Sequence, residues 1–204
     1  MQITKAVFQC SSERITQVPN DALRDIAFIG RSNVGKSSLI NMLTRHAGLA
    51  KVSATPGKTR LINHFRINDE WYLVDLPGYG YARTSKKERG LFSKIITDYI
   101  FQCEKMHFLF VLVDIRHEPQ AIDMAFITRL GEAGVPFGLI FTKADKLSAA
   151  QRRASIERYK ARLSEQWEEL PPLFVSSSEK QVGRDEILDF IGKCLEIAPE
   201  TEKR

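Results

Sequence analysis

The segment Gly30–Ser37 carries two glycines, a lysine and a serine in the spacing G-x-x-x-x-G-K-[ST]. At this spacing the glycines let backbone N–H groups turn inward around a phosphate, and the lysine can reach the outer phosphates of a nucleotide. The adjacent serine hydroxyl is an oxygen ligand of the kind that Mg²⁺ takes. An apolar run at 26–29 predicts a buried strand before the motif, and a helix is expected after it. The predicted phosphate contacts are Gly30, Arg31, Ser32, Asn33, Val34, Gly35, Lys36 and Ser37.

A second motif, Asp75-Leu-Pro-Gly78, follows another apolar strand. The Asp75 carboxylate can hold Mg²⁺ through a water molecule, and the Gly78 N–H can bond a γ-phosphate. Alone, an Asp-x-Pro-Gly sequence is a common turn, but together with the lysine motif it predicts the other half of a phosphate site. All four residues, Asp75, Leu76, Pro77 and Gly78, are predicted contacts, and Lys36 and Gly78 are assigned catalytic roles.

Between these motifs lies Thr55-Pro-Gly-Lys-Thr-Arg60, a loop sequence without hydrophobic periodicity. In nucleotide switches such a loop presents a threonine hydroxyl to Mg²⁺ and a backbone N–H to the γ-phosphate. Thr55 and Thr59 both qualify on chemistry. The predicted contacts from this loop are Gly57, Lys58, Thr59, Arg60 and Leu61.

A third motif, Thr142-Lys-Ala-Asp145, stands at the end of another apolar strand and is predicted to recognise the base of the nucleotide. The Asp145 carboxylate can accept hydrogen bonds from guanine N1–H and the N2 amino group, whereas adenine would present a lone pair at N1. The Lys143 stem can pack across the purine, and the serine run 176–178 offers backbone N–H groups to guanine O6. The predicted base contacts are Thr142, Lys143, Ala144, Asp145, Val175, Ser176 and Ser177. The ordered set of segments predicts GTP as the ligand and a P-loop GTPase as the class.

The elements that position these motifs alternate along the chain. Strands are expected at 26–29, 61–68, 71–75, 108–114, 137–142 and 173–175, and helices at about 36–45, up to 101, 120–132, 149–168 and 184–195. This order predicts a three-layer α/β domain with a mostly parallel six-stranded sheet, one antiparallel strand, and helices on both faces. We divide the chain into an N-terminal extension (1–24), a GTP-binding domain (25–196) and a tail (197–204). The extension either adds a strand or stays mobile.

The composition fits an ordinary globular protein: 204 residues, a net charge of +5 and three widely spaced cysteines. No apolar run is long enough to span a bilayer, and no signal peptide or lipidation motif is present. We therefore expect a cytoplasmic monomer with free thiols and no membrane contact. The basic balance permits binding to nucleic acid through phosphate contacts.

The motifs resemble those of the translation-factor-like GTPases and, within them, the EngB family, also called YihA or YsxC. The closer match lies in the lysine motif with its continuation to Asn41, in 55–60, in Asp75-Leu-Pro-Gly-Tyr-Gly-Tyr81 and in Thr142-Lys-Ala-Asp145. The resemblance covers about 25–195. It implies a bacterial GTPase of large ribosomal subunit assembly, needed for normal cell division and septation. It also implies Ser37 and Thr59 as Mg²⁺ ligands, with Thr59 preferred over Thr55 and counted among the catalytic residues.

Two positions depart from the broader GTPase pattern. Thr142 stands where many GTPases carry Asn, so one side-chain amide contact to the base or to the phosphate loop is expected to be lost. The hydroxyl replaces it only in part, and we expect guanine affinity to be modest. Tyr79 stands where Ras-like enzymes place the glutamine that orients the attacking water, so intrinsic hydrolysis should be slow and should need a group from a partner. Asn33 resembles the asparagine with which some related GTPases hold K⁺; alternatively, it only bonds the loop backbone.

A basic segment with aromatic residues follows Gly78. Its position after the γ-phosphate contact suggests that it binds ribosomal RNA in one nucleotide state only. The predicted RNA contacts are Tyr81, Arg83, Lys86 and Lys87. Two other functions stay open: a protein-binding switch in cell division without RNA contact, and a GTP-binding module without catalysis.

Overall fold

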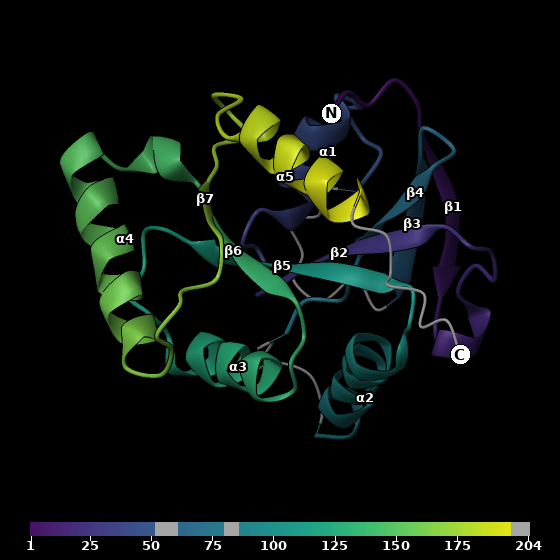
Figure 1. Cartoon of the computed structure of the whole chain (residues 1–204), viewed down its shortest axis with the longest axis horizontal. Helices are drawn as coiled ribbons and strands as arrows, with labels where there is room; N and C mark the ends of the chain where they lie inside the picture. The colour runs from purple at the N-terminus through teal and green to yellow at the C-terminus, as the bar shows by residue number, and fades with distance from the viewer. Residues whose placement is uncertain (52–60, 80–85, 197–204) are drawn as a thin grey trace.

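A seven-stranded sheet forms the centre of the part of the chain that the structure describes (Figure 1). This computed structural model describes residues 1–51, 61–79 and 86–196, with the backbone alone for 86–93. The strands are β1 (Ala6–Ser12), β2 (Arg24–Gly30), β3 (Ile62–Ile67), β4 (Trp71–Asp75), β5 (Met106–Asp114), β6 (Phe137–Thr142) and β7 (Leu173–Val175). Their order is β1-β3-β4-β2-β5-β6-β7. Neighbours from β4 to β7 pair in parallel. Strand β3 is antiparallel to β4, as predicted, and also to β1.

The number of strands corrects the prediction of six. The seventh is β1, which pairs with β3 from Ala6 opposite Ile67 to Ser12 opposite Ile62. Asn68 fixes this edge, because its Oδ1 accepts hydrogen bonds from the backbone N–H groups of Thr4 and Lys5 at 2.9 and 3.1 Å. The beginning of the N-terminal extension therefore adds a strand to the sheet.

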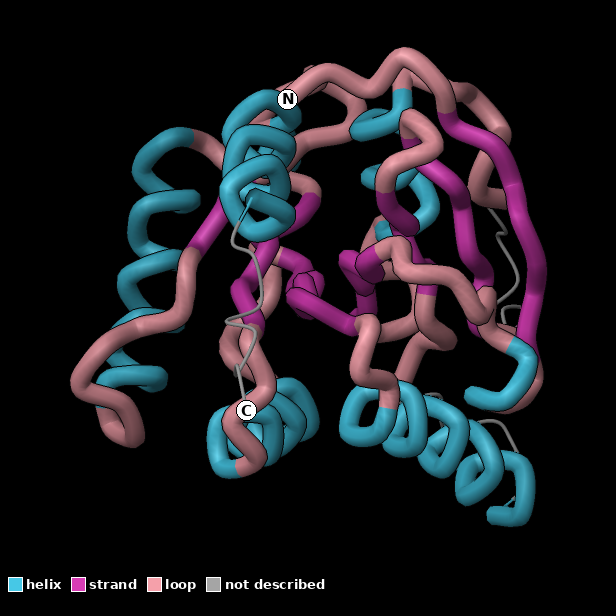
Figure 2. Tube along the Cα trace, turned by 45° about the vertical axis from the view of Figure 1, so that its right-hand side comes forward, coloured by secondary structure: helices cyan, strands magenta, loops and turns pink. Residues whose placement is uncertain are grey.

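The helices cover both faces of the sheet (Figures 1 and 2). They are α1 (Lys36–Thr44), α2 (Lys86–Gln102), α3 (Ala121–Glu132), α4 (Ala149–Ser164) and α5 (Arg184–Glu196). Helix α4 ends before the predicted residue 168. The chain turns there so that the Trp167 indole packs against Gly131 of α3 and Phe137 of β6. No helix in the described ranges is both long and apolar enough to cross a membrane.

Two apolar layers hold the helices to the sheet. Leu39 of α1 and Ile187 of α5 are fully buried against one face. Tyr99 of α2 and Ile127 of α3 are fully buried against the other. Burial of such side chains contributes about 1.5–3 kcal/mol each. This packing fixes the strand ends, and the parallel strands β2, β4, β6 and β7 bring their carboxyl ends to one edge of the sheet, where ligands bind in such folds.

Candidate functional site

The phosphate loop connects β2 to α1. Gly35, the residue before α1, has φ = 103°, which is a left-handed conformation that favours glycine. Lys36 begins the helix with its side chain largely buried, and burial lowers the pKa of its ammonium group to about 7. The Lys36 Nζ forms an ion pair with Asp75 Oδ1, which acts in the opposite direction by favouring the charged lysine. Ser37 follows in the first helical turn and is half-buried.

The segment after β4 lies directly against this loop. The Leu76 N–H donates to Phe28 O at 3.0 Å, and the Tyr79 N–H donates to Gly30 O at 3.2 Å. Gly78 fits between them because it has no side chain: a Cβ there would lie 3.2 Å from Gly30 O and 3.3 Å from Ser32 N. The two predicted halves of the phosphate site are therefore in contact.

Tyr79 directs its side chain to helix α3. Its hydroxyl donates to Asp123 Oδ1 at 3.0 Å, and its ring lies 4.8 Å from that of Phe126. Burial, together with the Asp123 carboxylate, raises the pKa of Tyr79 well above its usual value, so the phenol stays protonated. The prediction that Tyr79 does not replace a water-orienting glutamine agrees with this placement.

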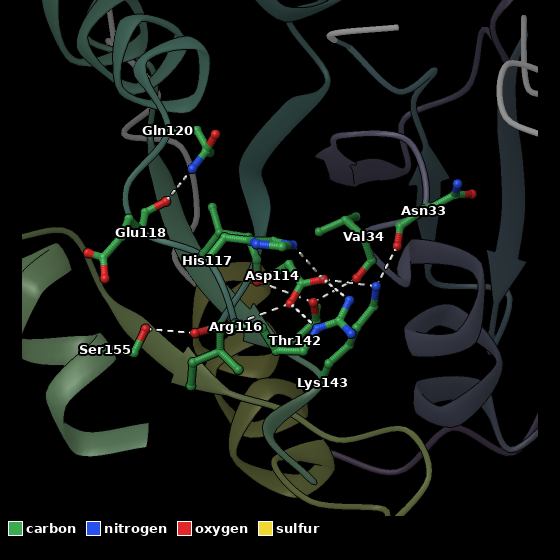
Figure 3. Close-up of polar contacts among 12 residues, drawn as sticks. Asn33, Val34, Asp114, Arg116, His117, Glu118, Gln120, Thr142, Lys143 and Ser155 are labelled. Atoms are coloured by element: carbon green, nitrogen blue, oxygen red, sulfur yellow. Dashed lines mark hydrogen bonds and ion pairs between the residues drawn. The ribbon is translucent and has the colours of Figure 1, made fainter. Parts of the chain in front are cut away.

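The base-reading loop is tied to the phosphate loop through Thr142 (Figure 3). The Thr142 hydroxyl donates to Val34 O at 2.7 Å, with Val113 O at 3.2 Å. The hydroxyl thus supplies one contact to the phosphate loop in place of the amide, and the shorter side chain reaches Val34 because the end of β6 lies close to that loop.

Lys143 carries a second connection between the two loops. Its ammonium group donates to Asn33 O at 2.7 Å and pairs with Asp114 Oδ2 at 2.9 Å. Asp114 also receives two side-chain hydrogen bonds from Arg116, at 2.9 and 2.7 Å (Figure 3). Although burial opposes ionisation, the bonds from Arg116 and Lys143 hold the pKa of Asp114 well below its usual range. Sequence reasoning missed Asp114 and Arg116, which follow β5 in an ordinary Asp-x-Arg pattern.

Asp145 lies in a short 3₁₀ turn, Ala144–Lys146, after β6. Its Oδ1 accepts a hydrogen bond from the Ser177 hydroxyl at 2.6 Å, and its Oδ2 pairs with Lys146 at 3.0 Å. The bond from Ser177, together with Lys146, lowers the pKa of Asp145 to about 2, so the carboxylate is ionised at neutral pH.

The serine loop after β7 uses two of its backbone donors internally. The Ser176 N–H donates to Phe141 O at 2.8 Å, and the Ser177 N–H donates to Val182 O at 3.2 Å. Neither is a donor that guanine O6 can take without breaking these bonds. Ser177 instead positions Asp145 through its side chain, a role that the sequence did not indicate.

The remaining predicted residues divide into two groups. Leu61, Leu76, Pro77, Ala144 and Val175 lie at the same edge of the sheet, next to the motifs that they extend. Thr55, Gly57, Lys58, Thr59, Arg60, Tyr81 and Arg83 lie outside the described residues, and Lys86 and Lys87 begin α2, where only the backbone is described. Among the described residues, no group of three or more His, Cys, Asp or Glu side chains is placed to hold a metal ion.

Comparison with known proteins then decides the family. Residues 25–143 match a family described as a 50S ribosome-binding GTPase. A probable GTP-binding protein EngB of Phocaeicola vulgatus is 59% identical over 191 residues, which cover 94% of this chain and 96% of that protein. The chain belongs to the EngB family. It is accordingly a GTP-binding protein that hydrolyses GTP, and the predicted resemblance is confirmed.

Other EngB relatives agree. The probable GTP-binding protein EngB of Porphyromonas gingivalis is 56% identical over 191 residues, 94% of this chain and 95% of that protein. The crystal structure of a probable GTP-binding protein EngB superposes with a TM-score of 0.69 at 22% identity, covering 84% of this chain and 98% of that one. This structural likeness confirms the fold.

Proposed function

We propose that this EngB protein is a GTP-gated switch in assembly of the large ribosomal subunit and, through it, in normal cell division. One observation carries the proposal: Gly78, the predicted γ-phosphate contact, lies against the phosphate loop and is followed closely by the basic start of α2. A change at the γ-phosphate can thus be passed to a basic segment suited to RNA. The description of the matched family as 50S ribosome-binding supports the same partner. Action on ribosomal subunits implies the cytoplasm.

The phosphates are bound by the backbone of 30–37 and by Lys36, with Mg²⁺ as the cofactor. Ser37 and Asp75 fit this ion, because both supply oxygen atoms and the buried Asp75 Oδ1 has an ion pair but no hydrogen bond. Ser37 and Thr59 would be direct ligands and Asp75 a ligand through water. When bound, Mg²⁺ neutralises charge that develops on the phosphate oxygens.

Guanine is recognised by Asp145, with the Lys143 stem against the purine face. Asp145 is ionised and held at both oxygens, which orients it before the ligand arrives. Because Ser176 and Ser177 use their own N–H groups within the protein, we assign the contact to guanine O6 to the N–H of Ser178.

Hydrolysis by the isolated protein is slow, at or below about 10⁻³ s⁻¹, the scale of an unassisted GTPase. The Tyr79 hydroxyl is already bonded to Asp123, so it does not orient water. A group from the partner or a K⁺ ion at Asn33 completes the site. Asn33 holds Lys143 through its backbone carbonyl. Its side-chain amide is not used in that contact and can therefore bind K⁺ or bond the loop backbone. Equal turnover in K⁺ and Na⁺ at the same ionic strength would remove the potassium ion from this account.

The test of the ribosomal function is co-sedimentation of the protein with large ribosomal subunits. It is run with a non-hydrolysable GTP analogue, with GDP and without nucleotide, at two salt concentrations. Binding only with the analogue, weakened steeply by salt, is expected for a switch that contacts RNA phosphates. Charge reversal at Arg83, Lys86 and Lys87 should then reduce both the binding and its salt dependence.

The alternative function is a protein-binding GTP switch in cell division with no ribosomal RNA contact. Binding to a protein partner that resists salt, together with no co-sedimentation in any nucleotide state, would favour this alternative.

A further inference from the structure

The residue after Gly78 connects the γ-phosphate side of the site to helix α3. We propose that Tyr79 and Asp123 are positioning residues: together they hold Gly78 against the phosphate loop and so raise the affinity for GTP relative to GDP. The inference rests on the proposed contact between the Gly78 N–H and the γ-phosphate, and it adds two residues that no sequence motif assigns to that contact.

The backbone provides the first half of this positioning. The Tyr79 N–H donates to Gly30 O at 3.2 Å, and Arg31 and Tyr79 form an isolated parallel bridge. Gly78 is thereby held in contact with the phosphate loop, within reach of Gly30 O and Ser32 N. Beyond Leu76, this 3.2 Å hydrogen bond is the one that the backbone supplies, and a single bond contributes only about 1 kcal/mol, so the backbone alone holds Gly78 weakly.

The Tyr79 side chain provides the second half. Its ring packs on Phe126, and its hydroxyl donates to Asp123, a residue that is only 3% exposed. Both partners lie on α3, which is fixed to the sheet by fully buried residues such as Ile127 and Leu130. Arg31 lies close enough to affect both Tyr79 and Asp123 electrostatically, so the phosphate loop, Tyr79 and α3 meet at one point.

This arrangement predicts an effect on one nucleotide only. GDP is bound by the phosphate loop and the base-reading loops, whose connections run through Thr142, Lys143 and Asp114. Tyr79 takes no part in those connections. Loosening Tyr79 therefore removes a preformed contact to the γ-phosphate and leaves the GDP contacts in place.

The Tyr79→Phe variant tests the proposal, because it keeps the ring on Phe126 and removes the hydroxyl. Asp123 borders a pocket of about 190 Å³, also lined by Arg31 and Tyr159, from which water can solvate its carboxylate in the variant. Affinities of the full chain for GDP and for a non-hydrolysable GTP analogue are measured by displacement of a fluorescent nucleotide. We expect the analogue to bind about 3- to 10-fold more weakly, the effect of one hydrogen bond, and GDP within about 2-fold of wild type.

Two further variants separate positioning from folding. Tyr159→Phe removes the hydroxyl of another buried tyrosine that lines the same pocket and should leave the ratio of the two affinities unchanged. Asp123→Asn keeps an oxygen that accepts from Tyr79 and should retain most of the GTP preference, whereas Asp123→Ala should lose it. Thermal unfolding confirms that each variant is folded.

The proposal is overturned if Tyr79→Phe weakens both nucleotides equally, leaves their ratio unchanged or strengthens binding of the analogue. Equal affinities of the wild-type protein for GDP and for the GTP analogue would instead contradict the proposed role of Gly78 itself, before any variant is considered.

Discussion

The two ends of the nucleotide site are built differently. At the base end, side chains connect separate loops: Thr142 and Lys143 bond the phosphate loop, Lys143 also pairs with Asp114, and Ser177 holds Asp145. At the γ-phosphate end, the ion pair from Lys36 holds Asp75 at the end of β4. Beyond Asp75, the described connections are the backbone contacts of Leu76, Gly78 and Tyr79 and, from side chains, the packing of the Tyr79 ring on Phe126 and its hydrogen bond to Asp123.

This difference corresponds to two tasks. Guanine is present in both GTP and GDP, so a base end that is rigid before binding lowers the ordering cost for either nucleotide. A γ-phosphate is present in GTP alone, and a switch needs an element whose position costs little to change. Changes at the base end should therefore affect both nucleotides alike, and changes at the γ-phosphate end should affect their ratio.

The largest effect is expected from Asp145→Asn. Guanine N1–H and the N2 amino group would face an amide that supplies only one acceptor, so GTP and GDP should both bind at least about 100-fold more weakly. Their ratio should stay at the wild-type value. Xanthine carries a carbonyl where guanine carries N2, so xanthosine diphosphate should bind this variant and show that it is folded. A selective loss of GTP would contradict the assignment of Asp145 to the base.

A smaller effect, again the same for GTP and GDP, is expected from Asp114→Asn. Lys143 would lose its ionic partner but keep Asn33 O, and both affinities should fall about 5- to 10-fold. Glu118→Gln is the matched control, because Glu118 pairs at 2.8 Å with the exposed Arg158 just beyond the same loop. That surface pair should contribute almost nothing. Equal losses in the two variants would show that Asp114 has no special connection to the base end.

The smallest effect is a change in stability with pH for Ser177→Ala. The bond from Ser177 is the largest of the interactions that together lower the pKa of Asp145 from 3.8 to about 2, so it stabilises the fold above pH 3.8 and this contribution disappears as the pH falls toward 2. The variant should lose about 1–2 kcal/mol of unfolding free energy at neutral pH. Urea unfolding near pH 3 should show a smaller difference in unfolding free energy between variant and wild type than at neutral pH. An equal difference at the two pH values would contradict the conclusion that Ser177 stabilises the ionised form of Asp145.

Sequence alone predicted the parts of this site that are local in the chain. The loops at 30–37, 75–78 and 142–145 each follow an apolar strand, so their place at one edge of a parallel sheet could be inferred and is confirmed. The strand β1 could not be decided, because three of its first four residues, Val7, Phe8 and Gln9, are exposed and give no alternation of buried and exposed positions.

The connections between motifs could not be predicted, because they depend on which strands and helices are neighbours. Asp114 contacts Lys143 only because β5 and β6 pair, and Asp123 contacts Tyr79 only because α3 lies beside the segment after β4. In the sequence each is a single acidic residue after a strand or within a helix, a pattern that most often indicates a solvated position.

The comparison between the two ends is tested most directly by Gly78→Ala. An added Cβ would lie 3.2 Å from Gly30 O and 3.3 Å from Ser32 N, so the segment should shift away from the phosphate loop while the base end stays intact. The dissociation constants for GDP and for a non-hydrolysable GTP analogue are measured on the same preparation. We predict an analogue affinity reduced about 10-fold or more, with GDP affinity within about 2-fold of wild type. An equal loss of both nucleotides would contradict the conclusion that this end distinguishes GTP from GDP.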